Sequence, residues 1–218
     1  MLCYEVGMKR AAAVTALAAL AFASTASAAA PTQTKWIDRK DGFSAILPPK
    51  WYPVPRTVAA VQQTIASLKK QKKAALASEY SFYLTAPGRA QLKDYVFQAF
   101  LDISPSTDPI APQFAVQVSK GSKPYTNADL PAAGRAYASA LAQHKGAKIS
   151  APKRIELPAG PAQFVTGTVP AGTGIADGFE LYLLIHKGKL YALKFDVDAS
   201  VLSQAKVLRS IAEHFAWV

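Results

Sequence analysis

Two pairs of serine and lysine have the spacing that could support covalent chemistry. Ser67 with Lys70 and Ser203 with Lys206 are each separated by two residues, as the nucleophile and its lysine are in serine acyl-enzymes. Those enzymes also need Ser-Asp-Asn and Lys-Thr-Gly elements, and the chain has neither. With 25 lysine and arginine residues among 218, such pairs arise by chance. We therefore interpret both pairs as coincidental.

No other catalytic motif is complete. The chain has no Gly-x-Ser-x-Gly, no His-Glu-x-x-His and no P-loop sequence, which are the signatures of common hydrolases, metalloproteases and nucleotide-binding enzymes. The histidines, His144, His186 and His214, are scattered along the sequence, and we interpret them as structural or solvated side chains. The sequence predicts a protein that is not an enzyme, with no cofactor and no metal site.

One carboxylate pair leaves an alternative open. Asp196 and Asp198 fall on the same face of an expected strand. They either offer oxygen ligands to a hard cation or are simply solvated. We favour solvation.

A run of four lysines interrupts the first expected helix. At 100° per residue, Lys72 falls in the middle of the apolar stripe to which Leu68 belongs. The helix therefore breaks near Gln71, or its second part projects from the body, or the lysine stems lie over apolar surface. We interpret the run as a solvated helical turn or, alternatively, as a patch that contacts an anionic partner. The run consists of Lys69, Lys70, Lys72 and Lys73.

The beginning of the chain has the features of a secretory signal. Lys9 and Arg10 precede an apolar run over residues 11–23, and small residues then lead to a cleavage site, so that residues 1–28 are expected to be a signal peptide. The apolar run is too short to span a bilayer. Translation starts at Met1 or, as an alternative, at Met8.

Cysteine usage and charge limit the function further. Cys3 is the chain's one cysteine and lies within the expected signal, so we expect no disulfide, no thiol chemistry and no lipid anchor in the mature protein. The formal net charge of +11 favours anionic neighbours such as envelope polymers, lipid headgroups or acidic proteins. The expected location is the secreted, periplasmic or cell-wall space, where nucleic acid is not an expected partner and the mature chain has no transmembrane segment.

A single domain is expected after the signal. Residues 29–35 are a tether of small residues, and residues 36–218 show no repeat, linker or change of composition. Alternating apolar residues predict strands. These cover residues 34–38, 43–47, 80–85, 95–103, 114–119, 149–157, 162–169, 179–186 and 190–197.

Three helices are expected between these strands. The first covers residues 58–77 behind Thr57 as N-cap. The second begins at Asp129, although Thr126 and Asp129 also have the spacing of a capping box, and it ends near Gly146. The third covers residues 201–215. Antiparallel strands interspersed with helices predict an α+β fold.

The stretch Gly-Phe-Ser-Ala-Ile-Leu-Pro-Pro-Lys-Trp, residues 42–51, describes a corner of this fold. A tight turn precedes a short strand, and the strand ends at Pro48 because a proline cannot donate a hydrogen bond within a sheet. Trp51 then has enough apolar area to anchor the chain reversal in the core. We interpret the stretch as a structural corner and not as a binding loop.

Two segments resemble the PsbP-like family, named for the extrinsic protein of the photosynthetic oxygen-evolving complex. One is the Gly-Phe-Ser-x-x-Leu-Pro-x-x-Trp pattern of residues 42–51, and the other comprises the turn and strand of residues 188–193 with the closing helix of residues 210–215. The resemblance implies an α/β/α sandwich around an antiparallel sheet, in proteins that mostly bind or assist others. Its fold anchors here are Phe43, Pro48, Trp51, Gly188, Tyr191 and Phe215.

The sequence therefore predicts an exported, non-catalytic binding or accessory module of the bacterial cell envelope, which contacts an anionic partner. A carrier of a lipid or small hydrophobic molecule is the alternative, and a hydrolase is third. An apolar cavity would favour the carrier. A cluster of serine, histidine and carboxylate within hydrogen-bond reach would favour the hydrolase.

Overall fold

A computed structural model of the chain describes residues 33–102, 112–170, 176–198 and 205–218. The expected signal peptide, Cys3 and Ser203 lie outside the described residues. The strands are β1 Thr34–Asp38, β2 Phe43–Leu47, β3 Trp51–Pro53, β4 Tyr95–Leu101, β5 Gln113–Ser119, β6 Lys148–Ile149, β7 Lys153–Leu157, β8 Gly160–Pro170, β9 Ala176–His186, β10 Lys189–Asp198 and β11 Ala216–Trp217. The helices are α1 Val58–Lys70, α2 Ala74–Phe82, α3 Ala86–Asp94, α4 Leu130–Ala142 and α5 Ala205–Glu213, with a 3₁₀ turn at Asn127–Asp129.

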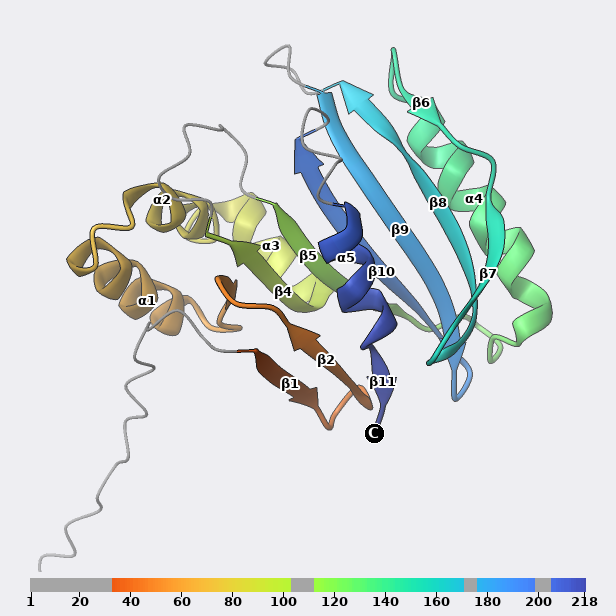
Figure 1. Cartoon of the computed structure of the whole chain (residues 1–218), viewed down its shortest axis with the longest axis horizontal. Coiled ribbons are helices and arrows are strands. Elements are labelled where there is room, and N and C mark those ends of the chain that lie inside the picture. The colour runs from red at the N-terminus through yellow and green to blue at the C-terminus, as the bar shows by residue number, and fades with distance from the viewer. Residues whose placement is uncertain (1–32, 103–111, 171–175, 199–204) are drawn as a thin grey trace, which may run out of the picture.

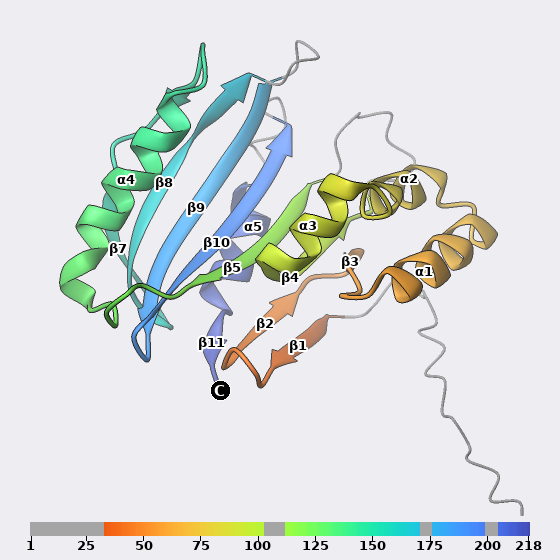
Figure 2. The same ribbon diagram turned by 180° about the vertical axis from the view of Figure 1, so that it is seen from behind.

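The strands form two antiparallel sheets. Eight belong to a large sheet with the order β3-β4-β5-β10-β9-β8-β6, in which β7 also pairs with β8, and three form a small sheet with the order β1-β2-β11. Helix α4 covers one face of the large sheet, while α5 and the small sheet lie against the other face (Figures 1 and 2). The expected α+β sandwich around an antiparallel sheet is confirmed.

The hairpin between β9 and β10 forms the centre of the large sheet. Lys187 and Gly188 both have positive φ angles, 46° and 72°, as the two central residues of a type I′ turn require. A Cβ atom at position 188 would lie 2.8 Å from the Cβ of Pro124, so glycine also fits this position for steric reasons. The turn sets the pairing of His186 with Lys189.

The main core fills the space between the two sheets and α5. Alternate side chains of β10 belong to it, together with Leu208 and Ile211 of α5. Those of β10 are Tyr191, Leu193, Phe195 and Val197. The ring of Phe43 on β2 stacks on that of Phe215, with centroids 5.2 Å apart. Strand β9 is apolar on both faces because α4 packs on one side and the main core lies on the other.

The first expected helix is in fact two helices. The Thr57 side chain accepts a hydrogen bond from the Ala60 amide at 3.2 Å, as a cap should. Helix α1 then ends in a Schellman motif, in which the amide of Lys73 donates to the Leu68 carbonyl at 2.9 Å and Lys72 takes the left-handed conformation with φ of 61°. Of the three arrangements left open by the sequence, the break near Gln71 is the one observed.

The prediction of a strand over residues 80–85 was wrong. Tyr80 and Tyr83 are both buried with Phe100 in a separate cluster, and their separation of three residues places them on one face of a helical turn. Phe82, two residues after Tyr80, is exposed instead, as helical and not strand spacing requires. Helix α3 was missed as well, although Thr85 caps it by accepting from the Gly88 amide at 3.2 Å.

The capping box of Thr126 and Asp129 starts the 3₁₀ turn, and α4 begins directly after Asp129, whose side chain makes no cap hydrogen bond to α4. The Asp129 carboxylate accepts from the Thr126 amide at 2.7 Å and from its hydroxyl at 2.9 Å, which closes the 3₁₀ turn, and α4 follows directly. Chain exit from α4 passes through Gly146 with φ of 83°, as expected. The hydrogen bonds from Thr126, first from its backbone amide, lower the pKa of Asp129.

Candidate functional site

The four lysines of the predicted patch do not share one environment. Lys69, Lys70 and Lys72 are exposed at the end of α1. Lys73 turns inward and has only 20% of its side chain exposed. The surface patch at this junction therefore consists of three lysines, Lys69, Lys70 and Lys72, which we call the α1 lysine patch.

Lys73 connects the junction of α1 and α2 to the edge of the large sheet. Its ammonium group forms an ion pair with Asp102, directly after β4, and donates to the Tyr52 hydroxyl at 2.7 Å. The Tyr80 hydroxyl donates to the Tyr52 carbonyl at 2.7 Å. Burial pulls the pKa of Lys73 down, but the hydrogen bonds to Asp102 and Tyr52 outweigh it, and the pKa lies above its usual 10.5. Lys73 therefore stays charged and holds the junction in place.

The residues marked as fold anchors lie in or beside the main core. Trp51, Phe43 and Phe215 are fully buried. Gly188 forms the hairpin turn described above, and Pro48 follows directly after β2, with its carbonyl accepting from the Trp51 amide at 3.4 Å. Their positions are those of structural residues.

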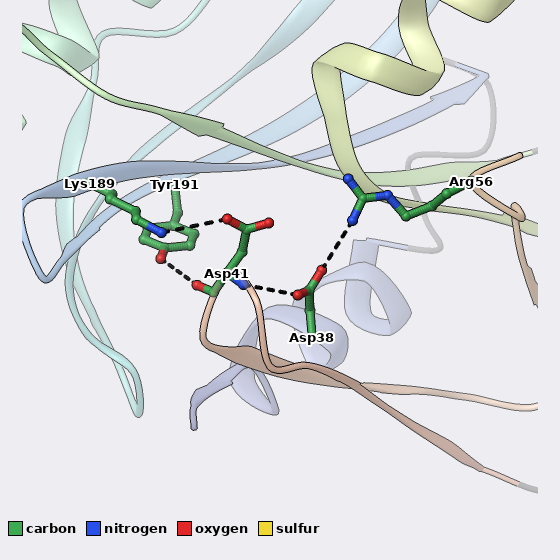
Figure 3. A network of polar contacts seen from close by, with 5 residues as sticks. All are labelled: Asp38, Asp41, Arg56, Lys189 and Tyr191. Atoms are coloured by element: carbon green, nitrogen blue, oxygen red, sulfur yellow. Dashed lines mark hydrogen bonds and ion pairs between the residues drawn. The ribbon is translucent and has the colours of Figure 1, made fainter.

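A polar network fixes the turn between β1 and β2 against the large sheet (Figure 3). The Tyr191 hydroxyl donates to the Asp41 carbonyl at 2.6 Å, and the Lys189 ammonium lies 3.5 Å from the Asp41 carboxylate. Asp38 accepts from the Asp41 amide at 2.9 Å and lies 3.7 Å from the Arg56 guanidinium. Burial raises the pKa of Tyr191, and the nearby aspartates raise it further. The network joins elements distant in sequence and has the form of a structural clamp.

A small cavity of about 10 Å³ lies beside this network. Its lining includes Trp36 of β1, Arg56, Leu92 of α3, and Phe97 and Gln98 of β4. Gln98 has only 3% of its surface exposed. Neither amide atom of Gln98, nor the indole nitrogen of Trp36, has a hydrogen-bond partner within the described parts of the chain.

Strand β9 also carries a buried acid. Glu180 of β9 is 7% exposed, and its carboxylate accepts from the Tyr182 hydroxyl at 2.8 Å. Burial raises the pKa of Glu180, although the Tyr182 hydrogen bond and the Arg209 charge oppose the shift. The Tyr182 hydroxyl supplies one hydrogen bond to the acid, and the Tyr182 ring contacts the rings of Phe164 and Phe195.

The histidines have separate local roles. The His186 ring stacks on Trp217 at 4.2 Å between centroids, His214 meets the Ser210 carbonyl at 2.7 Å, and His144 is exposed after α4. In the ranges that the structure describes, no three residues of the types His, Cys, Asp and Glu lie close enough together to hold a metal.

The remaining residues considered for catalysis or cation binding either have partners close in sequence or lie outside the described residues. Asp196 forms an ion pair with Lys194 at 3.0 Å, while the Asp198 side chain lies outside the described residues. The Ser67 hydroxyl accepts from the Gln71 amide at 3.2 Å. Within the described portion of the protein, no helix is both long and apolar enough to cross a membrane.

Solved structures with the same arrangement of elements cover most of the chain. The cyanobacterial PsbP protein, CyanoP, of Synechocystis superposes with a TM-score of 0.54 at 12% sequence identity, over 85% of this chain and 92% of that one. The fold is PsbP-like. LpqN of Mycobacterium tuberculosis, a protein involved in cell envelope biogenesis, shares the PsbP-like fold with a TM-score of 0.51 at 13% identity, over 84% of this chain and 89% of that one.

A longer protein of Bacteroides thetaiotaomicron also contains this PsbP-like arrangement. It superposes with a TM-score of 0.51 at 10% identity and covers 86% of this chain, while this chain spans about half of it, 49%. No protein-family model matches the chain, and no curated protein sequence matches it. The likeness therefore rests on the arrangement of elements and not on sequence.

Sequence reasoning missed the cavity and its polar lining. One signal was present, because Gln98 is the one polar residue between Tyr95 and Leu101 in the strand Tyr-Val-Phe-Gln-Ala-Phe-Leu. A polar side chain within an apolar strand is expected to have a hydrogen-bond partner. The surroundings of Gln98 depend on where β1 and α3 pack against β4. The sequence around Gln98 does not indicate those positions.

Proposed function

We propose that this protein is an exported, non-catalytic accessory module of the bacterial cell envelope, which contacts an anionic envelope surface through the α1 lysine patch. The PsbP-like fold supports the accessory role, since it also occurs in LpqN, a protein involved in cell envelope biogenesis. The signal-like sequence of residues 1–28 and the net charge of +11 support export and an anionic partner.

The conformation of Lys72 is the observation that carries the proposal. It occupies the left-handed position of the Schellman motif, with φ of 61°, where glycine is usual and another residue costs about 1–2 kcal/mol. A lysine at this position is therefore unfavourable for the fold. Its side chain is exposed, as are those of Lys69 and Lys70 in the preceding turn, and the junction that carries them is held in place because Lys73 is paired with Asp102.

The energy available to the patch is sufficient for measurable binding. A lysine close to an anionic membrane surface contributes about 1 kcal/mol, so that three lysines contribute about 3 kcal/mol at low salt. Salt screens this attraction over about 8 Å at physiological ionic strength. Lys69 and Lys70 also lie in the last turn of α1, where positive charge stabilises a helix, and stability and binding must therefore be measured separately.

Charge removal tests the proposal. We expect the triple variant Lys69→Gln, Lys70→Gln, Lys72→Gln to lose co-sedimentation with anionic vesicles, or with anionic cell-wall preparations, at low salt. The matched control is Lys120→Gln, Lys123→Gln, Lys145→Gln, which removes the same charge from exposed positions flanking α4. The control should bind like the parent. Equal losses in both variants would show that only net charge matters.

Lys72→Gly separates the two roles of that lysine. Glycine relieves the left-handed conformation, so the variant is expected to be more stable towards urea and yet to bind anionic vesicles more weakly. If the parent protein binds neither vesicles nor wall material at low salt, the envelope contact is wrong. If the parent protein bound only acidic proteins, the partner of the α1 lysine patch would be a protein and not an envelope surface.

The carrier alternative has less support. The cavity of about 10 Å³ has room for a group the size of a water molecule, whereas an acyl chain needs hundreds of cubic ångströms. We therefore keep the accessory role as the proposed function.

A further inference from the structure

The tyrosines among the described residues fall into two groups. One group is buried in the cores and comprises Tyr52, Tyr80, Tyr83, Tyr182 and Tyr191. The others, Tyr95, Tyr125 and Tyr137, are partly exposed. They come from the start of β4, from the segment before α4 and from α4 itself, and the fold brings them to one place on the large sheet.

Strand β5 supplies polar residues at this place. Gln117 lies directly opposite Tyr95 in the β4–β5 ladder and directly opposite Ala192 of β10 on its other side, and opposite residues project to the same face of a sheet. Ser119, two residues further on, projects to that face as well. Gln117 and Ser119 are both partly exposed. Figure 2 shows this end of β5 between α4 and α3, with neither helix over it.

The two remaining tyrosines approach this end of β5 from the side of α4. Tyr125 and Tyr137 pack against the hydrophobic cluster that contains Ala192. Burial raises the pKa of Tyr137, a hydrogen bond with Ser119 opposes the shift, and the nearby hydroxyls of Tyr95 and Tyr125 add to it. These side chains are therefore close neighbours. We call the group the tyrosine cluster, and it consists of Tyr95, Gln117, Ser119, Tyr125 and Tyr137.

The chemistry of the tyrosine cluster indicates the kind of ligand that it fits. None of its side chains is an acid or a base that is charged at neutral pH, although the chain has a net charge of +11. Its hydroxyl groups and the Gln117 amide can each donate and accept hydrogen bonds. A tyrosine ring adds an apolar face beside a polar tip, and tyrosine is enriched among the residues that dominate binding surfaces. The ligand should therefore be uncharged, rich in hydroxyl groups and partly apolar.

Sugars and uncharged peptides are the two ligand classes to compare. A sugar ring has C–H groups on its faces and hydroxyl groups around its edge, which matches tyrosine rings next to hydroxyl and amide groups. A peptide that binds to a sheet commonly pairs its backbone with an edge strand. Strand β5 is paired on both sides, with β4 and with β10, so its backbone is not available for such pairing. The arrangement therefore favours a sugar.

We propose that the tyrosine cluster binds an uncharged oligosaccharide. Gln117 and the Tyr137 hydroxyl bond to the sugar hydroxyl groups, and the rings of Tyr95 and Tyr125 contact its C–H faces. The site lies on the sheet surface, where water competes for the same hydrogen bonds, so we expect a dissociation constant of about 1 mM. It is separate from the α1 lysine patch, because α4 and α1 lie at opposite ends of the molecule (Figure 2).

Binding is tested by NMR titration of the full chain with four uncharged probes. The sugars are maltotriose, cellotriose and chitotriose, and the fourth probe is triglycine that is acetylated at one end and amidated at the other. We expect at least one sugar to shift the Gln117 side-chain amide and the ring signals of the clustered tyrosines in a saturable way. Added salt should leave this binding unchanged, since no charge takes part.

Two results of the titration would contradict the proposal. One is the absence of shifts at these residues for all three sugars at concentrations about tenfold above the expected constant. The other is a response to triglycine alone, which would assign the surface to peptides. The variant that lacks the three lysines of the α1 lysine patch should bind the sugar like the parent, so that failure of the envelope contact and failure of this site are distinguishable.

Variants then separate the ring from the hydrogen bonds. Tyr95→Phe keeps the ring and should retain most of the affinity, whereas Tyr95→Ala should weaken binding about tenfold. Gln117→Leu keeps the size of the side chain and should also weaken binding about tenfold. The matched control is Gln143→Leu, at an exposed position at the end of α4, which should bind like the parent. Urea midpoints identify variants that lose stability. Unchanged sugar affinity in Tyr95→Ala and Gln117→Leu would show that the tyrosine cluster is not the site.

Discussion

Individual buried side chains in this protein differ in how well their polar atoms are satisfied. Trp51 is fully buried, and its indole N–H has no partner among the described residues, so its contribution comes from apolar packing. Glu180 has one good hydrogen bond, yet burial makes its charged form unfavourable. These two residues give opposite expectations when each is replaced.

Removing the Trp51 ring should destabilise the protein strongly. We expect Trp51→Ala to lower the free energy of unfolding by about 3 kcal/mol, because it leaves a large cavity in the main core. Urea denaturation followed by circular dichroism measures this value. Trp51→Phe is the control, since it keeps most of the apolar volume, and its loss should be clearly smaller. No loss for the alanine variant would return residues 42–51 to the candidates for a binding loop.

Replacing Glu180 should have an effect that depends on pH. Its raised pKa means that the folded protein holds this proton more tightly than the unfolded chain, so the charged group lowers stability above the folded-state pKa. We expect Glu180→Gln to be more stable than the parent at pH 7. The difference should shrink as the pH falls through the folded pKa and disappear below the usual value of 4.5. Unfolding midpoints measured from pH 3 to pH 8 would reveal a pH-independent difference if this assignment were wrong.

At the level of elements, the junction of α1 and α2 depends on a contact across the chain. The Schellman motif ends α1 locally, but α2 keeps its place because Lys73 bonds to Tyr52 and Asp102. Tyr80 adds a hydrogen bond to the Tyr52 carbonyl. The junction that carries the α1 lysine patch is thus attached to β3 and to the end of β4.

Breaking this contact should loosen the junction. We expect Asp102→Asn to lower the free energy of unfolding by about 1–3 kcal/mol, because it leaves the Lys73 charge without its counter-ion in a partly buried position. Lys73→Met combined with Asp102→Asn should restore part of the loss, and the double-mutant cycle gives the coupling energy. Additive losses would show that the two residues act independently.

At the level of the whole molecule, the small and large sheets depend on one core. Strand β11 near the carboxy-terminus pairs with β2 near the start of the fold, and the Val218 amide donates to the Gly42 carbonyl at 3.1 Å. Both sheets and α5 contribute to the main core. The facing sides of the two sheets therefore share one hydrophobic core.

Unfolding is accordingly expected to be a single cooperative transition. Near-ultraviolet circular dichroism reports the packing of the aromatic core, and the far-ultraviolet signal reports the sheets and helices. Their urea midpoints should coincide, as in two-state unfolding. Separate midpoints would divide the chain into two units and contradict the single domain expected over residues 36–218.

Local features of this protein were determined by the sequence itself. The bounds of β1 and β2, the Thr57 cap and the type I′ hairpin at Gly188 follow from alternation, capping chemistry and backbone freedom, all of which act within a few residues. The sequence pattern of residues 42–51 was sufficient to indicate the PsbP-like fold, which the solved structures share.

Only the tertiary structure decided which side chains meet. Lys73 bonds to Asp102, 29 residues away. Tyr80 in α2 and Tyr83 at its C-cap are buried in one cluster with Phe100 of β4. Gln98 and Trp36, which belong to different sheets, both contribute to the lining of one small cavity. Such contacts depend on how elements distant in sequence pack together. Local conformational preferences are weak compared with the free energy of burial, so tertiary contacts can change both the structure of a short segment and the direction of a lysine side chain.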